Sequence, residues 1–159
     1  MRKVNPMRMK LAVAVAGVAL MIAAVPVVGH HAFSAEFDAT RPVKLEGPVV
    51  KVEWINPHAW IHIEVTKEEV TKEEVTKEVW AIEGGTPNTL FRRGFTKDSL
   101  MPGTHIVVDG YQAKDGSNKM NGRNLTLPNG DSLFLGSSGT GAPRDGADPR
   151  EKTRKKANE

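Results

Sequence analysis

Residues 49–65, VVKVEWINPHAWIHIEV, constrain the fold most, because they predict two β-strands that meet at a proline corner. Apolar and polar residues alternate in both halves, and a period of two is typical of strands with one buried face. Pro57 has no amide proton to donate and a fixed φ, so it separates the two strands. The residues expected to face inward are Val50, Val52, Trp54, Ile61, Ile63 and Val65.

The remaining pattern predicts an all-β domain with one short helix. The first strand is expected to extend back to Val43, with a bend at Gly47-Pro48. Thr86 as N-cap, Pro87 in the first turn and Gly94 as the stop predict a helix over residues 86–94. Further strands are expected at 79–83, 104–111, 120–127 and 132–135.

Three strands, a helix and then further strands follow the order of the OB-fold, a five-stranded Greek-key barrel. We therefore expect an OB-like barrel over residues 30–136, with a small β-sandwich or roll as the alternative. Such barrels bind many kinds of ligand, so the fold alone does not indicate a function.

Both ends of the chain differ from this domain. Residues 1–29 resemble a secretory signal, with a basic start, an apolar run up to Val28 and small residues before His30. We expect cleavage after Gly29, a periplasmic or secreted product, and membrane contact only through the signal before cleavage. Residues 137–159 contain few apolar side chains and are expected to be a disordered tail.

Charge and cysteine content exclude several functions. The signal carries four of the 22 lysines and arginines and no acid, so the remainder has 18 bases against 19 acids and a net charge of −1. We therefore expect no nucleic-acid partner. The absence of cysteine excludes disulfides, a thiol nucleophile and thiolate metal sites.

A repeat interrupts the strand pattern at residues 66–78. The sequence TKEEV occurs twice and is followed by TKEV. Valine at every fifth position fits neither a strand nor a helix. We therefore interpret the repeat as an insertion that lengthens a solvated loop between the second and third strands.

Several motifs together resemble a family of small secreted bacterial proteins that is catalogued only as a domain of unknown function. The motifs are HHAFSAEFD, KVEWINPHAWIHIEV, EGGTPNTLFRRGF, DSLMPG and GYQAKDGSN, and the resemblance spans roughly His30 to Leu135. The repeat at 66–78 departs from this resemblance. The resemblance implies an exported small β domain, and it implies no reaction and no binding residues.

The expected mature N-terminus is a candidate metal site. Cleavage would give His30 a free α-amine beside its imidazole, and this set of nitrogen ligands suits Cu(II). His31, His58 or His62 would supply a second imidazole. The alternative is that His30 and His31 are exposed without a ligand. No other cofactor is expected.

The proline corner and the helix supply the candidate ligand-binding residues. Trp54, His58 and Trp60 place a histidine beside two aromatic rings, although His58 could instead cap the turn. Glu83 could act as a general base or satisfy the positive end of the helix, and Arg92 could recognise an anion or serve the helix dipole.

A second pair, His62 with Glu64, could bind a metal, and a solvent-exposed strand face is the alternative. No catalytic motif such as GxSxG, HExxH or a phosphate loop is present in the sequence. We therefore expect a non-enzymatic binding or accessory module for an unknown small ligand or a periplasmic protein partner. A copper-binding protein is one alternative, and a small enzyme that uses Glu83 is another.

Overall fold

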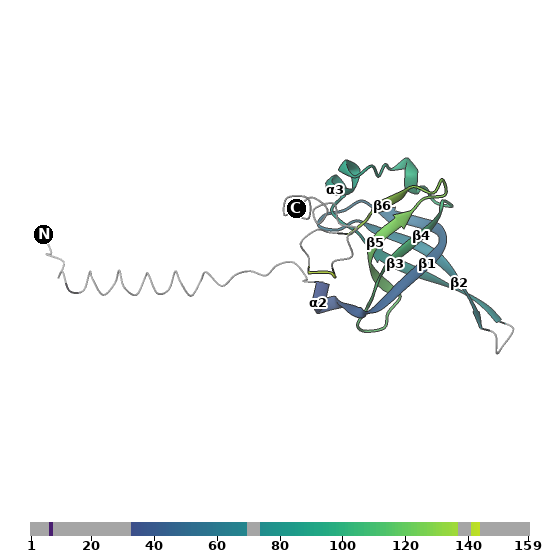
Figure 1. The fold of residues 1–159 in the computed structure, drawn as a ribbon, viewed down its shortest axis with the longest axis horizontal. Coiled ribbons are helices and arrows are strands. Elements are labelled where there is room, and N and C mark those ends of the chain that lie inside the picture. Colours follow the sequence, from purple (N-terminus) through teal and green to yellow (C-terminus); the bar gives the residue numbers. More distant parts are fainter. Residues whose placement is uncertain (1–6, 8–32, 70–73, 137–140, 144–159) are drawn as a thin grey trace, which may run out of the picture. The chain divides into compact units, whose positions relative to one another are not determined.

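The structure is a computed structural model, which describes Met7 and residues 33–69, 74–136 and 141–143 (Figure 1). Apart from Met7, the expected signal lies outside the described residues, and so do His30 and His31, two of the three expected metal ligands. Most of the expected tail also lies outside them. No helix in the described ranges has the length and hydrophobicity of a membrane span.

The fold is mostly β, as predicted, and the longest helix among the described residues lies between the third and fourth strands. Met7 apart, the elements are α2 (Phe33–Glu36), β1 (Phe37–Glu53), β2 (Trp60–Glu69), β3 (Glu74–Glu83), α3 (Pro87–Arg92), the 3-10 helix η1 (Asp98–Leu100), β4 (His105–Ala113), β5 (Lys119–Thr126) and β6 (Ser132–Phe134).

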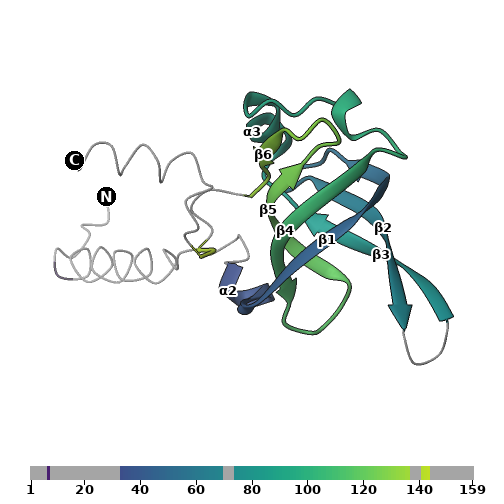
Figure 2. The ribbon, with the colours of Figure 1, turned by 45° about the vertical axis from the view of Figure 1, so that its right-hand side comes forward.

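The strands form one sheet in the order β3-β2-β1-β4-β5-β6, in which neighbours are antiparallel (Figures 1 and 2). In addition, β3 pairs in parallel with β5 through Ala81 with Lys119, Ile82 with Met120 and Glu83 with Asn121. The five longest strands are therefore linked in a ring of pairings, with β6 outside that ring.

The inward-facing side chains of these strands form most of the main hydrophobic core. On β2 the predicted alternation is confirmed, because Ile61, Ile63 and Val65 are buried while Trp60 and His62 are half-buried. Apolar side chains from the other four strands of the ring and from the α3 segment complete this core.

The inward face of β1 was predicted wrongly at one position. Val50 is 43% exposed, whereas its neighbour Val49 is only 2% exposed. The pairing with β2 shifts between Val49 and Lys51, and such a bulge moves the buried face by one residue. Trp54, which was expected to face inward, packs against the core but is only half-buried.

The helix prediction is confirmed in its details. Thr86 is the N-cap, and its hydroxyl accepts a hydrogen bond from the Thr89 amide at 3.4 Å. Pro87 occupies the first turn, where its missing amide proton costs nothing. Gly94 follows the helix with φ of +101°, a conformation that favours glycine.

The loop prediction for residues 66–78 is wrong in the described part. There β2 and β3 continue to pair as a two-stranded ribbon as far as Glu69 with Glu74 (Figure 2). A ribbon that extends past the core has no face to bury, so the spacing of the valines does not oppose strand formation. Two cross-strand ion pairs support it, Lys77 with Glu64 at 2.7 Å and Lys67 with Glu78 at 2.6 Å.

One repeat should be removable without loss of the fold. Deletion of residues 71–75 joins Val70 to Thr76. Residues 68–70 would then form a three-residue turn between the paired residues Lys67 and Thr76. We expect the melting temperature to change by no more than about 4 °C, because about 0.5 kcal/mol of surface contact is affected.

The control for this deletion lies on β2, the strand that precedes the deleted residues. Ile63 is fully buried, so Ile63→Ala should destabilise the protein by about 2–5 kcal/mol. The measurement is the melting temperature of the deletion variant and of Ile63→Ala, each compared with wild type. A deletion as damaging as Ile63→Ala would mean that the ribbon packs on the domain.

Candidate functional site

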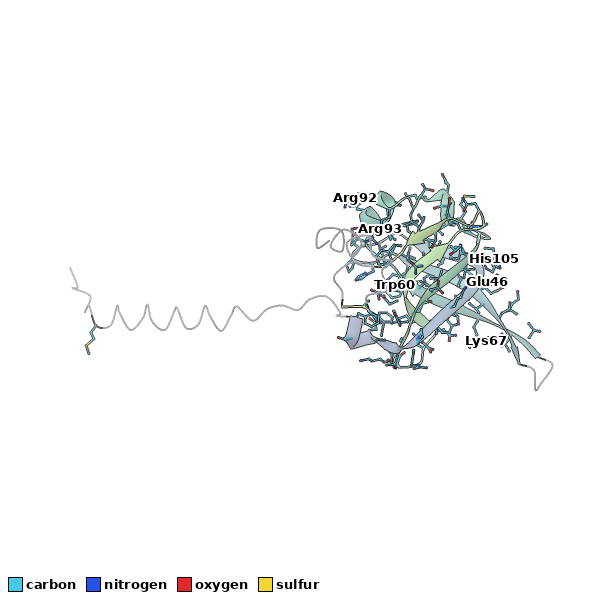
Figure 3. All side chains as sticks on the ribbon, viewed as in Figure 1. Glu46, Trp60, Lys67, Arg92, Arg93 and His105 are labelled. Carbon is cyan, nitrogen blue, oxygen red and sulfur yellow. The ribbon has the colours of Figure 1, made fainter. Side chains whose placement is uncertain are left out.

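The outward side of the β1–β2 hairpin carries the densest group of candidate residues. Trp60 on β2 lies in register with Glu53 on β1 and with Glu83 on β3. His58 lies two residues before Trp60 and His62 two residues after it, with both side chains partly buried. We call these five residues the Trp60 site, and Figure 3 labels Trp60 within it.

Backbone hydrogen bonds hold His58 at the end of β3. The Ala59 amide donates to the Gly85 carbonyl at 3.0 Å, and the Gly84 amide donates to the Ala59 carbonyl at 2.9 Å. These bonds bring the corner before β2 against the Gly84-Gly85 segment. His58 therefore reaches Glu83, which is far from it in sequence.

The neighbours of the His58 ring determine which ring nitrogen carries the proton. His58 Nδ1 lies 3.0 Å from the Gly84 carbonyl oxygen and 3.3 Å from Glu83 Oε1. Both oxygens are acceptors, so Nδ1 must carry the proton. A neutral ring then keeps Nε2 as an acceptor. Glu83 is itself only 8% exposed, so this pair is largely removed from water.

His62 is held in the opposite way. Its Nε2 lies 3.0 Å from Glu53 Oε2 and must donate to it, which leaves Nδ1 as the acceptor in the neutral ring. Hydrogen bonds from Lys51 and then from His62 lower the pKa of the Glu53 carboxyl below its usual value. Two glutamates thus orient two imidazoles, one before and one after Trp60 on the chain.

Lys119 connects the Trp60 site to the first described helix, α2. Its ammonium lies 5.8 Å from the centre of the Trp60 ring and 2.7 Å from Glu36 Oε1. The hydrogen bond to Glu36 raises the pKa of Lys119. Phe33 anchors α2, because it is 3% exposed and its ring lies 5.4 Å from that of Tyr111.

The Trp60 site therefore combines a half-buried indole, two carboxylates and two oriented imidazoles. An indole face attracts cations, carboxylates add negative charge, and a neutral imidazole nitrogen can bind a metal or accept from an amine. Hydrogen bonding of the opposite ring nitrogen is the usual support of a histidine that binds a metal. Because the Lys119 ammonium already lies near the Trp60 ring and Lys51 pairs with Glu53, a ligand would be held mainly by the two imidazole acceptors, which suit a metal ion or an amine.

The structure brings only some of the predicted site residues together. His58, Trp60 and Glu83 meet, but Trp54 stacks on Phe91 of α3 with ring centres 4.9 Å apart. Arg92 donates from Nε to the Asn88 carbonyl at 3.1 Å on the surface of α3, and Figure 3 shows it apart from Trp60.

Sequence reasoning missed the partners of the two histidines. His62 was paired with Glu64, whereas Glu64 binds Lys77 and His62 binds Glu53. The hairpin register could have revealed Glu53, because Glu53 pairs with Trp60 and so lies diagonally across the two strands from His62. In the described part of the chain, no three His, Asp or Glu side chains are arranged to hold a metal ion.

The chain belongs to a family of unknown function, DUF6152, whose model matches residues 17–122. The predicted membership of a family without known function is therefore confirmed. No curated protein and no solved structure matches the chain.

The lowered pKa of Glu53 predicts a pH-dependent contribution to stability. A carboxyl whose pKa falls on folding stabilises the folded state above its unfolded pKa, and that contribution is lost as the pH falls through the folded pKa. We expect Glu53→Gln to lower the urea midpoint at about pH 6. The difference from wild type should shrink below the ordinary glutamate value of 4.5.

Glu46→Gln is the matched control for Glu53. The Glu46 side chain is 66% exposed and lies 3.8 Å from His105, so its loss should change the midpoint little (Figure 3). Urea unfolding of both variants at several pH values makes the comparison. An effect of Glu53→Gln that is equal across the pH range would contradict the assignment.

Proposed function

We propose that the protein is an OB-like barrel that acts as a non-enzymatic binding or accessory module in the periplasm. The ring of strand pairings and the position of α3 between β3 and β4 support the barrel, since both are features of OB-folds. The signal-like residues 1–29 support export. A net charge of −1 after cleavage offers no general attraction to nucleic acid.

The orientation of the two histidines at the Trp60 site carries this proposal. His58 and His62 each donate one ring proton to fixed oxygen atoms, so each keeps one acceptor nitrogen. Side chains that are pre-oriented by a second group lose less entropy on binding. The hydroxyl groups of the described residues make no hydrogen bond with His58, so a binding role fits this pair better than activation of a nucleophile.

Ligand-dependent stabilisation tests the binding proposal. A panel of divalent metal ions, polyamines and basic amino acids should contain a compound that raises the unfolding midpoint. A ligand present at about 100 times its Kd stabilises by about 2.7 kcal/mol. The gain should be lost in Trp60→Ala and kept in Val79→Ala, an exposed residue on the outward side of the neighbouring strand β3.

Two results would contradict the proposal. Equal stabilisation of wild type and Trp60→Ala would place the ligand elsewhere. A panel without any stabilising compound would exclude a cationic ligand at the Trp60 site.

Copper binding is a second candidate function, supported by His58. Its Nδ1 proton is directed at Gly84 and Glu83, and a histidine held in this way presents Nε2 to a metal. The expected mature N-terminus would add the amine and imidazole of His30, and His31 could add another imidazole. Cu(II) is the tightest-binding divalent ion of the first transition series.

Copper titration of defined N-termini tests this second candidate. Intact mass of protein from a periplasmic fraction should first show a chain that begins at His30. This chain should bind Cu(II) at least about tenfold more tightly than a version with one extra N-terminal residue or than His58→Gln. Equal affinity for the three proteins would exclude a site built from the N-terminus and His58.

A further inference from the structure

Three residues of the C-terminal tail, Gly141 to Pro143, pack on the domain. Figures 1 and 2 both draw this segment beside α2. Ala142 is partly buried against a second apolar cluster, separate from the main core, that contains Phe33 and Phe37. This short segment therefore has a defined docking surface, although the rest of the tail contains few apolar residues.

Aromatic rings form the apolar part of this docking surface. The centre of the Phe33 ring lies 5.8 Å from that of Phe37 and 5.4 Å from that of Tyr111. Phe33, Phe37 and Ala113 are each at most 3% exposed, and Tyr111 is half-buried beside them. The cluster, built by α2, β1 and β4, is therefore a preformed surface for the methyl group of Ala142.

Arg123 binds the main chain of the same segment. Its guanidinium donates a hydrogen bond to the Pro143 carbonyl at 3.1 Å and lies 4.8 Å from the centre of the Phe134 ring. Because the donor is charged, such a bond is strong, and it does not depend on the side chain of the bound residue. Peptide sites commonly combine main-chain bonds that give affinity with pockets that give specificity.

Loss of the segment would leave this surface incomplete. Arg123 is only 3% exposed, so without the Pro143 carbonyl its guanidinium would lack one acceptor in a place with little water. An unmade hydrogen bond of a buried donor is costly. A second peptide with a carbonyl at the same place would remove that cost, so exchange of one peptide for another is favoured over an empty surface.

A pocket of about 250 Å³ adjoins the docking surface. It lies between β1, β4 and β5, and both Tyr111 and Arg123 line it. Pro42 and Val43 add apolar surface to the same pocket. Gly141 to Pro143 therefore occupy only part of the available surface, which leaves space for a peptide with larger neighbouring side chains.

We propose that this surface is a binding site for a peptide segment of a partner protein, with a small apolar residue followed by proline, and that the tail occupies it in the absence of the partner. Ala142 and Pro143 show the chemistry that fits. Proline fixes its own φ and restricts the preceding residue to extended backbone, so such a peptide loses little entropy on binding. One partly buried alanine and one hydrogen bond are a small contact, which a partner peptide that also enters the pocket can replace.

Release of the tail is the first part of the test, and Tyr111 reports it because it is the single tyrosine of the chain. In full-length protein with ¹³C-labelled tyrosine, Ala142→Asp should shift the ring signal, since a carboxylate is costly against an apolar cluster. Ala142 lies outside every strand and helix, so cooperative unfolding should be kept. Ala147→Asp, with the same charge elsewhere in the tail, is the control and should leave the signal unchanged.

Recognition of a separate peptide is the second part. The acetylated and amidated peptide GAPRDG, the sequence of residues 141–146, should bind full-length Ala142→Asp with a Kd of about 1 mM or lower. It should also return the Tyr111 signal to its wild-type position. Wild type should bind the peptide at least about threefold more weakly, because the tethered tail competes at a high effective concentration. The peptide GDPRDG should bind neither protein.

Three results would overturn the proposal. The first is a Tyr111 signal that Ala142→Asp does not shift. The second is the absence of peptide binding to Ala142→Asp at about 10 mM GAPRDG, or equal binding of the two peptides. The third is a wild-type dimer, measured by light scattering, that is absent in Ala142→Asp, because the tail would then be exchanged between two copies of the chain.

Discussion

The parallel pairing of β3 with β5 is the contact on which the rest of the structure depends. Only three residues of each strand take part, yet they join two strands that are separated by three others in the sheet. The segments pack so closely that a Cβ on Gly122 would lie 2.5 Å from Leu135 Cδ2 and 2.8 Å from Ile82 Cγ2. Parallel strands need a long connection, which α3, η1 and β4 provide.

This pairing also determines where the chemistry lies. It fixes the end of β3, where Glu83 reaches His58 and the Gly84 carbonyl accepts a hydrogen bond from Nδ1 of the imidazole. Gly85 also holds this region together, because its amide donates a hydrogen bond to the Leu135 carbonyl and its carbonyl accepts one from the Ala59 amide. Backbone hydrogen bonds between strands therefore hold the His58 and Glu83 part of the Trp60 site in place.

Local features of the fold were predictable from the sequence, and features that depend on distant contacts were not. The inward face of β2 and the cap at Thr86 follow from side chains within one element. The bulge after Val49 was missed because Val49 and Val50 are both apolar, so alternation fits either phase. The pairing of His58 with Glu83 was missed because it exists only once β3 has paired with β2 and β5.

The central claim is that Glu83 and the Gly84 carbonyl, at the end of β3, hold the His58 ring with its proton on Nδ1. Its Nε2 is then available to a ligand. Two-bond ¹H–¹⁵N couplings in the histidine rings, measured at a pH where the imidazoles are neutral, test it most directly. The structure predicts the Nδ1–H tautomer for His58 and the Nε2–H tautomer for His62. A His58 ring with its proton on Nε2, or one that averages between the two tautomers, would contradict this account.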